Sequence, residues 1–387
     1  MFSPPLHKQR HEFVIQFVKE HKPKKVIDLG CGGLKLLRKL KFHREIELLT
    51  GVDANGSVIT KKMHSLSPLP SEYLQPGTGP LTIELYQGCV TEKEPRTKGY
   101  DLATCIELIE HLQPAKVDQF AEVLFGYMGP SAVIISTPNA DYNPLLPGCS
   151  GFRNLDHKFE WTQAEFHSWA LKISRSYGYR VEFSGVGKPP CHEESVGFCS
   201  QIGVFYKDPS KCNAPLRNQV NEDVPVYSLL YRVEYPSLCD NNIFHRTLMN
   251  EVLYSVECVR QQWLDALQNE AGDLQNVDSG TSDDSVSQAS GLDGQTPYRL
   301  GQNLCIPLAM VFSFPKVQKL SGSMQHLRSV LLDDSQVRVM GDVIVLPAIE
   351  EELTDTCEKS VCSCIDHGPA ENVDSVVDLD EDWDEQL

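Results

Sequence analysis

The segment Lys25-Val-Ile-Asp-Leu-Gly-Cys-Gly-Gly33 indicates the type of fold. A short apolar run that ends in glycines predicts a buried strand followed by a tight turn, and glycines at such a turn let the backbone approach a ligand closely. A dinucleotide-binding fingerprint would need a small residue where this chain has Lys35. The acidic residue before the first glycine, Asp28, instead suits a cofactor with an amino-acid head group, because a carboxylate can receive the amine.

Outward from this turn, strand-like and helix-like segments alternate as far as residue 207, a pattern typical of a sheet covered by helices. The predicted strands are residues 25–29, 47–52, 81–86, 100–106, 132–136, 180–186 and 201–206, and the predicted helices are residues 7–21, 34–42, 56–65, 114–127 and 162–177. We therefore predict a Rossmann-like α/β fold with a seven-stranded, mostly parallel sheet and helices on both faces. Residues 224–235 also alternate and are a candidate for one more strand.

Four further positions are predicted to line the cofactor site. The second strand leads into Asp53, whose carboxylate can accept hydrogen bonds from the ribose hydroxyls of an adenosine. Gly30 and Gly32 allow the close backbone approach, and Cys89 follows the third strand, where an adenine ring would lie. Asp28 or Asp53 alone is equally consistent with a turn cap or a solvated loop. Together, at successive strand ends, they favour S-adenosylmethionine as the cofactor.

A second group of polar residues follows the fourth predicted strand. Glu110 and His111 lie three and four residues after Glu107, a spacing that brings all three onto one side of a helical turn. Two carboxylates and an imidazole suit Mg²⁺, and the imidazole would also admit Mn²⁺ or Co²⁺. His157, after the fifth strand, is the best candidate for a fourth ligand. The alternative is a solvated first helical turn and a loop histidine.

The sequence resembles the family of small-RNA 3′-terminal 2′-O-methyltransferases, which includes the animal enzymes for PIWI-interacting RNAs. The resemblance covers about residues 1–235 and is carried by four stretches: Phe2-Ser-Pro-Pro-Leu-His-Lys-Gln-Arg10, Asp28–Gly33, Glu107–Leu112 and His157–Thr162. It implies a class I methyltransferase domain over residues 1–235, with residues 1–22 contacting substrate through Arg10. It also implies that the family's metal ligands are Glu107, Glu110, His111 and His157.

The resemblance further implies the reaction and its setting. A cation that contacts both the 2′ and 3′ oxygens of a terminal ribose lowers the pKa of the 2′-hydroxyl, and His111 is our candidate to take its proton. Glu107 and Glu110 complete the predicted catalytic group. The implied substrate is the 3′ end of a single-stranded small RNA, presented by a PIWI-type Argonaute in RNA silencing. The implied location is the cytoplasm, including germline ribonucleoprotein granules.

The second half of the chain has a different composition. Residues 1–210 hold 24 Lys and Arg against 23 Asp and Glu, whereas residues 211–387 hold 11 against 30, so the net charge of −18 belongs almost entirely to the second half. Residues 1–50 alone hold 11 Lys and Arg against 5 Asp and Glu, so this basic N-terminal stretch can meet RNA phosphates while an acidic tail stays away from them. The predicted organisation after residue 235 is a helical extension over 236–271, a flexible linker over 272–298, a strand-rich segment over 299–350 and an acidic, disordered tail over 351–387.

Three expectations concern location and assembly. No apolar run reaches the roughly 18 residues of a membrane helix, and the N-terminal residues lack the apolar core of a signal peptide. We therefore expect an intracellular protein with no membrane partner. The 13 cysteines are expected to be reduced thiols, and the protein is expected to be monomeric.

Two other functions remain as alternatives. A similar glycine turn and a Glu-His-Leu segment occur in small-molecule O-methyltransferases that act on catechol-like or quinone-precursor substrates, where chelation of adjacent oxygens would also serve. The acidic second half could instead belong to a non-catalytic adaptor of an RNA pathway. The basic N-terminal stretch and the segment His157–Thr162 favour RNA as the substrate.

Overall fold

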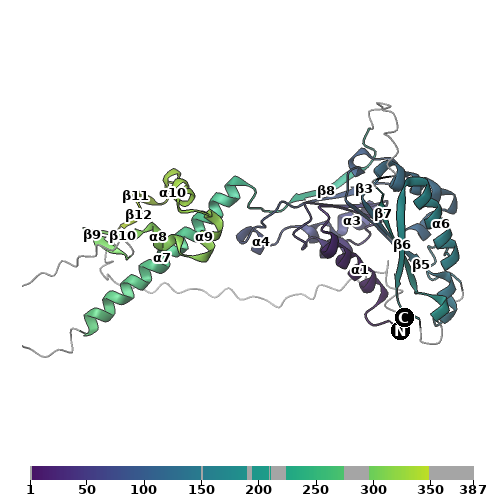
Figure 1. Cartoon of the computed structure of the whole chain (residues 1–387), viewed down its shortest axis with the longest axis horizontal. Helices are drawn as coiled ribbons and strands as arrows, with labels where there is room; N and C mark the ends of the chain where they lie inside the picture. The colour runs from purple at the N-terminus through teal and green to yellow at the C-terminus, as the bar shows by residue number, and fades with distance from the viewer. Residues whose placement is uncertain are drawn as a thin grey trace, which may run out of the picture. The chain divides into compact units, whose positions relative to one another are not determined.

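The computed structural model describes residues 2–149, 151–189, 194–208, 210, 224–273 and 296–347. They form two compact units that divide after Leu238 (Figure 1). The predicted acidic tail over 351–387 and most of the predicted linker over 272–298 lie outside the described residues. Within the described ranges, no helix combines the length and hydrophobicity that a membrane span requires.

The first unit is built from alternating strands and helices. Its strands are β1 (Lys25–Leu29), β2 (Leu48–Asp53), β3 (Thr82–Gln87), β4 (Leu102–Ile106), β5 (Ala132–Pro138), β6 (Tyr179–Val186), β7 (Ser200–Lys207) and β8 (Ser228–Glu234). Its α-helices are α1 (Leu6–His21), α2 (Lys35–Leu40), α3 (Gly56–Lys62), α4 (Pro70–Leu74), α5 (Val117–Ala121) and α6 (Gln163–Tyr177). Its other helical turns are η1 (Met63–Leu66), η2 (Pro95–Thr97), η3 (Ile109–His111), η4 (Pro114–Lys116), η5 (Glu122–Met128), η6 (Ala140–Leu145) and η7 (Glu194–Val196). The helix predicted over 114–127 is thus continued through η4, α5 and the π-helical η5.

The strands of the first unit form one sheet in the order β6-β7-β5-β4-β1-β2-β3-β8. The five neighbouring strands β3, β2, β1, β4 and β5 run parallel, so their carboxyl ends meet at one edge of the sheet. The strand order reverses between β1 and β4, the position where open α/β sheets bind ligands. The predicted Rossmann-like fold is confirmed, with helices on both faces of the sheet.

Alternating strand residues feed two hydrophobic cores. Ile27 and Leu29 of β1 pack toward α5, η5 and α6, whereas Val26 packs toward α1, α2 and α3. Figure 1 shows α1 and α6 on opposite sides of the sheet. The sheet is therefore buried on both faces, as its continuous apolar strands require.

The start of α6 illustrates how local sequence sets the element bounds. The Thr162 hydroxyl accepts a hydrogen bond from the Glu165 amide at 3.3 Å, and the Glu165 carboxylate accepts one from the Thr162 amide at 2.9 Å. This capping box ends the preceding segment and begins the helix. Gly178, with a φ of 71°, ends it in the left-handed conformation.

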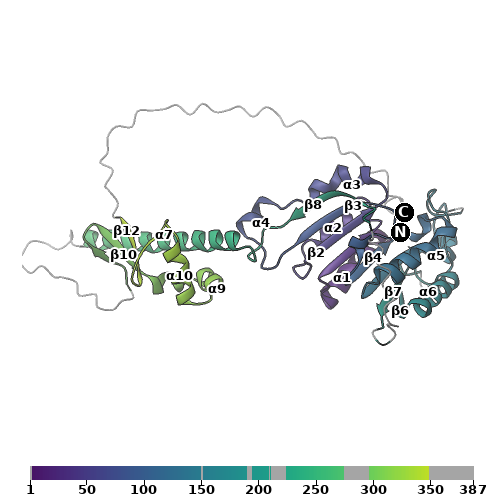
Figure 2. The same cartoon turned by 90° about the horizontal axis from the view of Figure 1, so that it is seen from above.

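The sheet has one strand more than the seven predicted. β8 pairs antiparallel with β3 at the sheet edge and corresponds to the candidate strand over 224–235 (Figure 2). Its start is held by Glu94, which is 1% exposed and accepts hydrogen bonds from the amides of Val226 and Tyr227, each at 2.8 Å. Arg96 completes the cluster by donating to Glu94 at 2.7 Å and to the Tyr227 carbonyl at 2.6 Å.

The second unit begins at Cys239 and contains a long helix beside a small sheet. Its elements are α7 (Asn241–Asp273), β9 (Tyr298–Leu300), β10 (Asn303–Pro307), α8 (Leu308–Phe312), α9 (Pro315–Ser321), α10 (Met324–Asp333), β11 (Arg338–Met340) and β12 (Val343–Pro347). The strands pair antiparallel in the order β11-β12-β10-β9. Val252 and Val256 of α7 share one core with Ile306 and Ile344 of the sheet. The helical extension and the strand-rich segment, which the sequence analysis treats separately, therefore form one folded unit.

The Glu94 cluster makes a prediction about stability. Burial alone would raise the pKa of Glu94, but hydrogen bonds from Arg96 and from the amides of Tyr227, Arg96 and Val226 outweigh it and lower the pKa to about 2. We expect Glu94→Gln to lower the free energy of unfolding by about 2 kcal/mol at neutral pH, because charged hydrogen bonds to buried groups are lost. A carboxylate with a lowered pKa stabilises the fold above its ordinary pKa, and this contribution is lost as the pH falls toward 2.

The measurement is denaturant unfolding of both proteins between pH 7 and pH 2. The difference between wild type and E94Q should be largest above pH 4.5, the ordinary value for this carboxyl, and should shrink toward pH 2. Glu92→Gln is the matched control, since Glu92 is exposed and lies two residues away. A difference that is independent of pH would contradict the assigned role of the carboxylate.

Candidate active site

The carboxyl ends of the five parallel strands enclose a cavity of about 410 Å³. Its size lies in the range of small-molecule sites. The lining residues come from α1 and from the segments that follow β1, β2, β3, β4 and β5: His7, Arg10, His11, Asp28, Gly30, Cys31, Gly32, Lys35, Leu36, Asp53, Ala54, Gly88, Cys89, Val90, Ile106, Glu107, Leu108, His111, Leu112, Asn154, Asp156 and His157. Every residue that the sequence predicts for the site, except Glu110, therefore lines this one cavity.

The turn after β1 shapes the cofactor end of the cavity. Gly30 and Gly32 have φ values of 77° and 44°, which favour glycine. A Cβ at Gly30 would also lie 2.8 Å from the Leu108 side chain. The Gly32 amide donates to the Asp53 carboxylate at 2.9 Å, so the turn is fastened to the end of β2.

The polar groups at this end fit S-adenosylmethionine. Asp28 is 4% exposed, lines the cavity and accepts a hydrogen bond from the Thr104 hydroxyl at 2.6 Å. Such a buried carboxylate at the wall suits the amine of an amino-acid head group. Asp53 and Cys89 line the wall at the ends of the next two strands, which suits the ribose and adenine of the same molecule.

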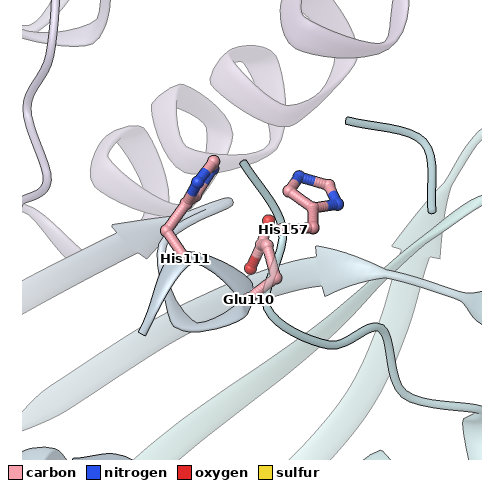
Figure 3. Close-up of side chains that lie close together, drawn as sticks. All are labelled: Glu110, His111 and His157. Atoms are coloured by element: carbon pink, nitrogen blue, oxygen red, sulfur yellow. The ribbon is translucent and has the colours of Figure 1, made fainter. Parts of the chain in front are cut away.

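Glu110, His111 and His157 form a group with the geometry of a cation site. Each offers one ligand atom, and these atoms lie within 4.8 Å of one another. Figure 3 shows Glu110 and His111 on one segment and His157 on another, with the two imidazoles near the carboxylate. The two rings are 4.9 Å apart, centroid to centroid. Burial and the nearby His157 lower the pKa of His111, which keeps its imidazole neutral at pH 7.

The Glu110 carboxylate is buried with one oxygen unsatisfied. Its exposed fraction is 0%, and one oxygen accepts a hydrogen bond from the Thr137 hydroxyl at 3.1 Å. The other oxygen has no hydrogen-bond partner. Burial and then the charge of Glu107 raise the pKa of Glu110 well above its ordinary range. A buried, half-satisfied carboxylate beside two imidazoles is costly without a cation and fits one well.

Glu160 orients His157 and is a residue that the sequence analysis missed. The Glu160 carboxylate is 2.5 Å from His157 Nδ1, and it also accepts from the Arg153 amide at 2.7 Å and the Asn143 side chain at 2.6 Å. These bonds outweigh burial and lower the pKa of Glu160. The contact occupies Nδ1 and leaves Nε2 for a cation, the arrangement common around metal-binding histidines. The available signal was a carboxylate three residues after the histidine.

A backbone contact joins the two segments that carry these residues. The Lys158 amide donates to the Glu110 carbonyl at 2.7 Å. The segment after β5 is also anchored at its base, where Asn139 and Trp161 form a parallel bridge. His157 is thereby held beside the turn after β4, although 46 residues separate it from His111 in the sequence.

Glu107 lies in the cavity wall but outside this group. It has a φ of 52° and precedes η3, so it is not on one helical turn with Glu110 and His111, as the spacing predicted. Its carboxylate accepts hydrogen bonds from the hydroxyls of Ser136 at 2.9 Å and Ser200 at 2.8 Å. The metal role of Glu107 therefore stays a prediction.

The α1 wall of the cavity is basic. Arg10 is 8% exposed, and its guanidinium lies 3.5 Å from Glu107. Lys35 and two histidines that the sequence analysis did not single out, His7 and His11, line the same wall. Burial, together with Lys39, Arg10, His7 and Lys35, lowers the pKa of His11 to about 3. Burial is the largest cause and the neighbouring cationic groups add to it, so the basic charge on this side comes from Arg10 and Lys35 and not from His11.

Comparison with known proteins gives the family. A family model described as the HENMT1 C-terminal domain matches residues 242–348. A small RNA 2′-O-methyltransferase of Gallus gallus is 40% identical over 362 residues, which cover 91% of this chain and 96% of that protein. One of Xenopus tropicalis is 40% identical over 356 residues, covering 89% and 96%.

The chain belongs to the small RNA 2′-O-methyltransferase family. Among solved structures, one described as the small RNA methyltransferase HEN1 is 29% identical over 61% of this chain and 28% of that chain, with a TM-score of 0.48. The Gallus gallus and Xenopus tropicalis relatives are named as small RNA 2′-O-methyltransferases. Family membership therefore favours neither of the two alternatives, a small-molecule O-methyltransferase or a non-catalytic adaptor.

The contact between Glu160 and His157 makes a prediction about this family member. We expect Glu160→Gln to weaken Mn²⁺ binding about 10- to 100-fold, because the outer carboxylate no longer fixes the imidazole. Isothermal titration calorimetry on the full chain measures the affinity, and thermal unfolding monitors the fold. Glu182→Gln is the control, since that side chain is 53% exposed on β6. Unchanged Mn²⁺ affinity in E160Q would show that Glu160 does not position a metal ligand.

Proposed function

We propose that the protein transfers the methyl group of S-adenosylmethionine to the 2′-hydroxyl of the 3′-terminal ribose of a single-stranded small RNA, with a divalent cation such as Mg²⁺, Mn²⁺ or Co²⁺. The carrying observation is the half-satisfied Glu110 carboxylate beside the imidazoles of His111 and His157. A divalent cation held there would lie in the same cavity as the predicted cofactor residues. The imidazole ligands favour Mn²⁺ or Co²⁺ alongside Mg²⁺.

The cation and the methyl donor would supply distinct chemistry. When bound, the cation lowers the pKa of a chelated ribose hydroxyl and S-adenosylmethionine presents an electrophilic methyl on a sulfonium. Asp28 and Asp53 would hold the donor, and Glu110 and His157 would hold the cation. His111 lies in the group as a ligand or as the base that accepts the hydroxyl proton, and either role requires a neutral imidazole. The new O–CH₃ bond forms as the S–CH₃ bond breaks, and the proton leaves the ribose oxygen.

The basic α1 wall supports RNA as the acceptor. Arg10 and Lys35 bring positive charge to one side of the cavity, where a polyanion would pass. The contact of Arg10 with Glu107 also places a guanidinium beside the predicted cation site. Contacts from arginine and lysine side chains to phosphates hold an RNA without reading its bases. A vicinal diol at the chain end is the feature that a chelating cation would select.

We extend the proposal to the RNA class and its carrier. A small basic wall cannot choose among RNA sequences, so selection would fall to a protein that holds the RNA and exposes its 3′ end. By family resemblance this partner is a PIWI-type Argonaute loaded with a PIWI-interacting RNA, in the cytoplasm and in germline granules. Methylation would protect the exposed end.

A series of RNAs that differ only at the terminal sugar tests the reaction. With labelled S-adenosylmethionine, we expect transfer to a ribose end and none to a 2′-deoxy or 2′-O-methyl end. A 3′-deoxy end should react at least about tenfold more slowly, because the cation loses one of its two oxygens.

The same assay has two informative extensions. RNA held by a PIWI-type Argonaute should react faster than free RNA if the partner presents the end, and an equal rate would remove the partner from the proposal. Transfer to the 2′-deoxy RNA at the rate of the ribose RNA, or to a catechol in place of RNA, would overturn the proposed acceptor.

A further inference from the structure

The loop after β3 is packed against a residue from far along the chain. Gly88, Cys89 and Val90 line the cavity where the nucleoside end of S-adenosylmethionine is expected. Tyr227 immediately precedes β8 and is 6% exposed. We infer that Tyr227 is a positioning residue for the cofactor, acting through this loop. The inference rests on S-adenosylmethionine as the methyl donor and is independent of the acceptor.

The Tyr227 hydroxyl holds the loop from behind. It donates to the Cys89 carbonyl at 2.8 Å and approaches the Glu92 carbonyl at 3.3 Å. These bonds fix the backbone on both sides of Val90, whose side chain is 7% exposed and belongs to the sheet core. The cavity face of the loop is therefore set by a hydroxyl that does not itself line the cavity.

The Tyr227 ring sets the position of Gly88. A Cβ at Gly88 would lie 2.2 Å from Tyr227 Cδ1, so the ring occupies the space of a side chain there. The φ of Gly88 is not in the left-handed region, so the ring is the main obstacle to a side chain at this position. The Gly88 amide donates to the Asp53 carbonyl at 3.0 Å. Displacement of Gly88 would thus also reach the predicted ribose-binding residue.

Tyr227 is itself fixed by the buried Glu94 cluster. Its amide donates to Glu94 at 2.8 Å, and its carbonyl accepts from Arg96 at 2.6 Å. Tyr227 thus makes hydrogen bonds through its amide, its carbonyl and its hydroxyl, which leaves its ring little freedom to follow a displaced loop. The residue that immediately precedes β8 thereby shapes the cofactor site.

The test compares two identical changes on the same segment. Tyr227→Phe removes the hydroxyl that bonds Cys89, and Tyr235→Phe removes one that donates to the Leu66 carbonyl at 2.6 Å, away from the cavity lining. On the full chain, calorimetry should show S-adenosylmethionine binding weakened about fivefold in Y227F, as expected for one lost hydrogen bond. Y235F should bind like wild type. In turnover assays the KM for the cofactor should rise in Y227F while the KM for RNA stays unchanged.

A double-mutant cycle separates positioning from general stability. Gly88→Ala should weaken cofactor binding strongly beside the intact ring and much less in a Tyr227→Ala background, where the methyl has room. This rescue distinguishes loop placement from loss of folding, whatever the stability of Y227F. Equal cofactor affinity in Y227F and wild type, or an effect of G88A that is the same in both backgrounds, would overturn the inference. Either result would leave the RNA acceptor untouched, because that acceptor is tested by the terminal-sugar series.

Discussion

The parallel register of β3, β2, β1, β4 and β5 is the constraint on which the site depends. Parallel strands that are buried on both faces must end together at one edge, and the reversal of strand order between β1 and β4 opens a crevice there. Each strand delivers one short segment to that crevice, so residues distant in sequence become neighbours. Asp28 and Asp53 arrive in this way at one end of the cavity, and His111 and His157 at the other, with the buried Glu110 close to both imidazoles.

At the cation end of the cavity, burial of the Glu110 carboxylate costs free energy, and a bound cation would offset that cost. A carboxylate at 0% exposure with an unsatisfied oxygen destabilises the fold unless a positive charge compensates it. The surrounding groups are prepared for that charge: His111 is kept neutral by burial, and His157 is oriented by Glu160. Arg10, which pairs with Glu107, balances the second carboxylate of the wall. The charges of Arg10 and Glu107 therefore nearly balance each other, whereas one oxygen of the Glu110 carboxylate has no hydrogen-bond partner among the described residues.

Local patterns were enough to predict the features that depend on neighbouring residues. The glycine turn, the strand ends at Asp28 and Asp53 and the helix that follows Thr162 all arise from backbone preferences within a few residues. The path of Glu107 was not predictable from spacing, because a left-handed residue before a 3₁₀ turn breaks the helical geometry that the spacing assumes. Glu160 contacts His157 only three residues away, so its role was open to local reasoning and was missed. The histidines of α1 and Tyr227, by contrast, act through contacts between distant segments, which periodicity does not report. The sequence also did not predict that the helical extension and the strand-rich segment form one unit, because α7 and the small sheet share a core although they lie far apart in the sequence.

The proposed reaction requires that Glu110, His111 and His157 together hold a divalent cation beside the methyl donor. Anomalous diffraction from crystals of the full chain grown with Mn²⁺ and S-adenosylhomocysteine tests it most directly. We expect one strong anomalous peak bounded by the Glu110 carboxylate and the two imidazoles, with the nucleoside of the product against Asp53. Mn²⁺ bound elsewhere in the cavity, with these three side chains making no contact to it, would contradict the account.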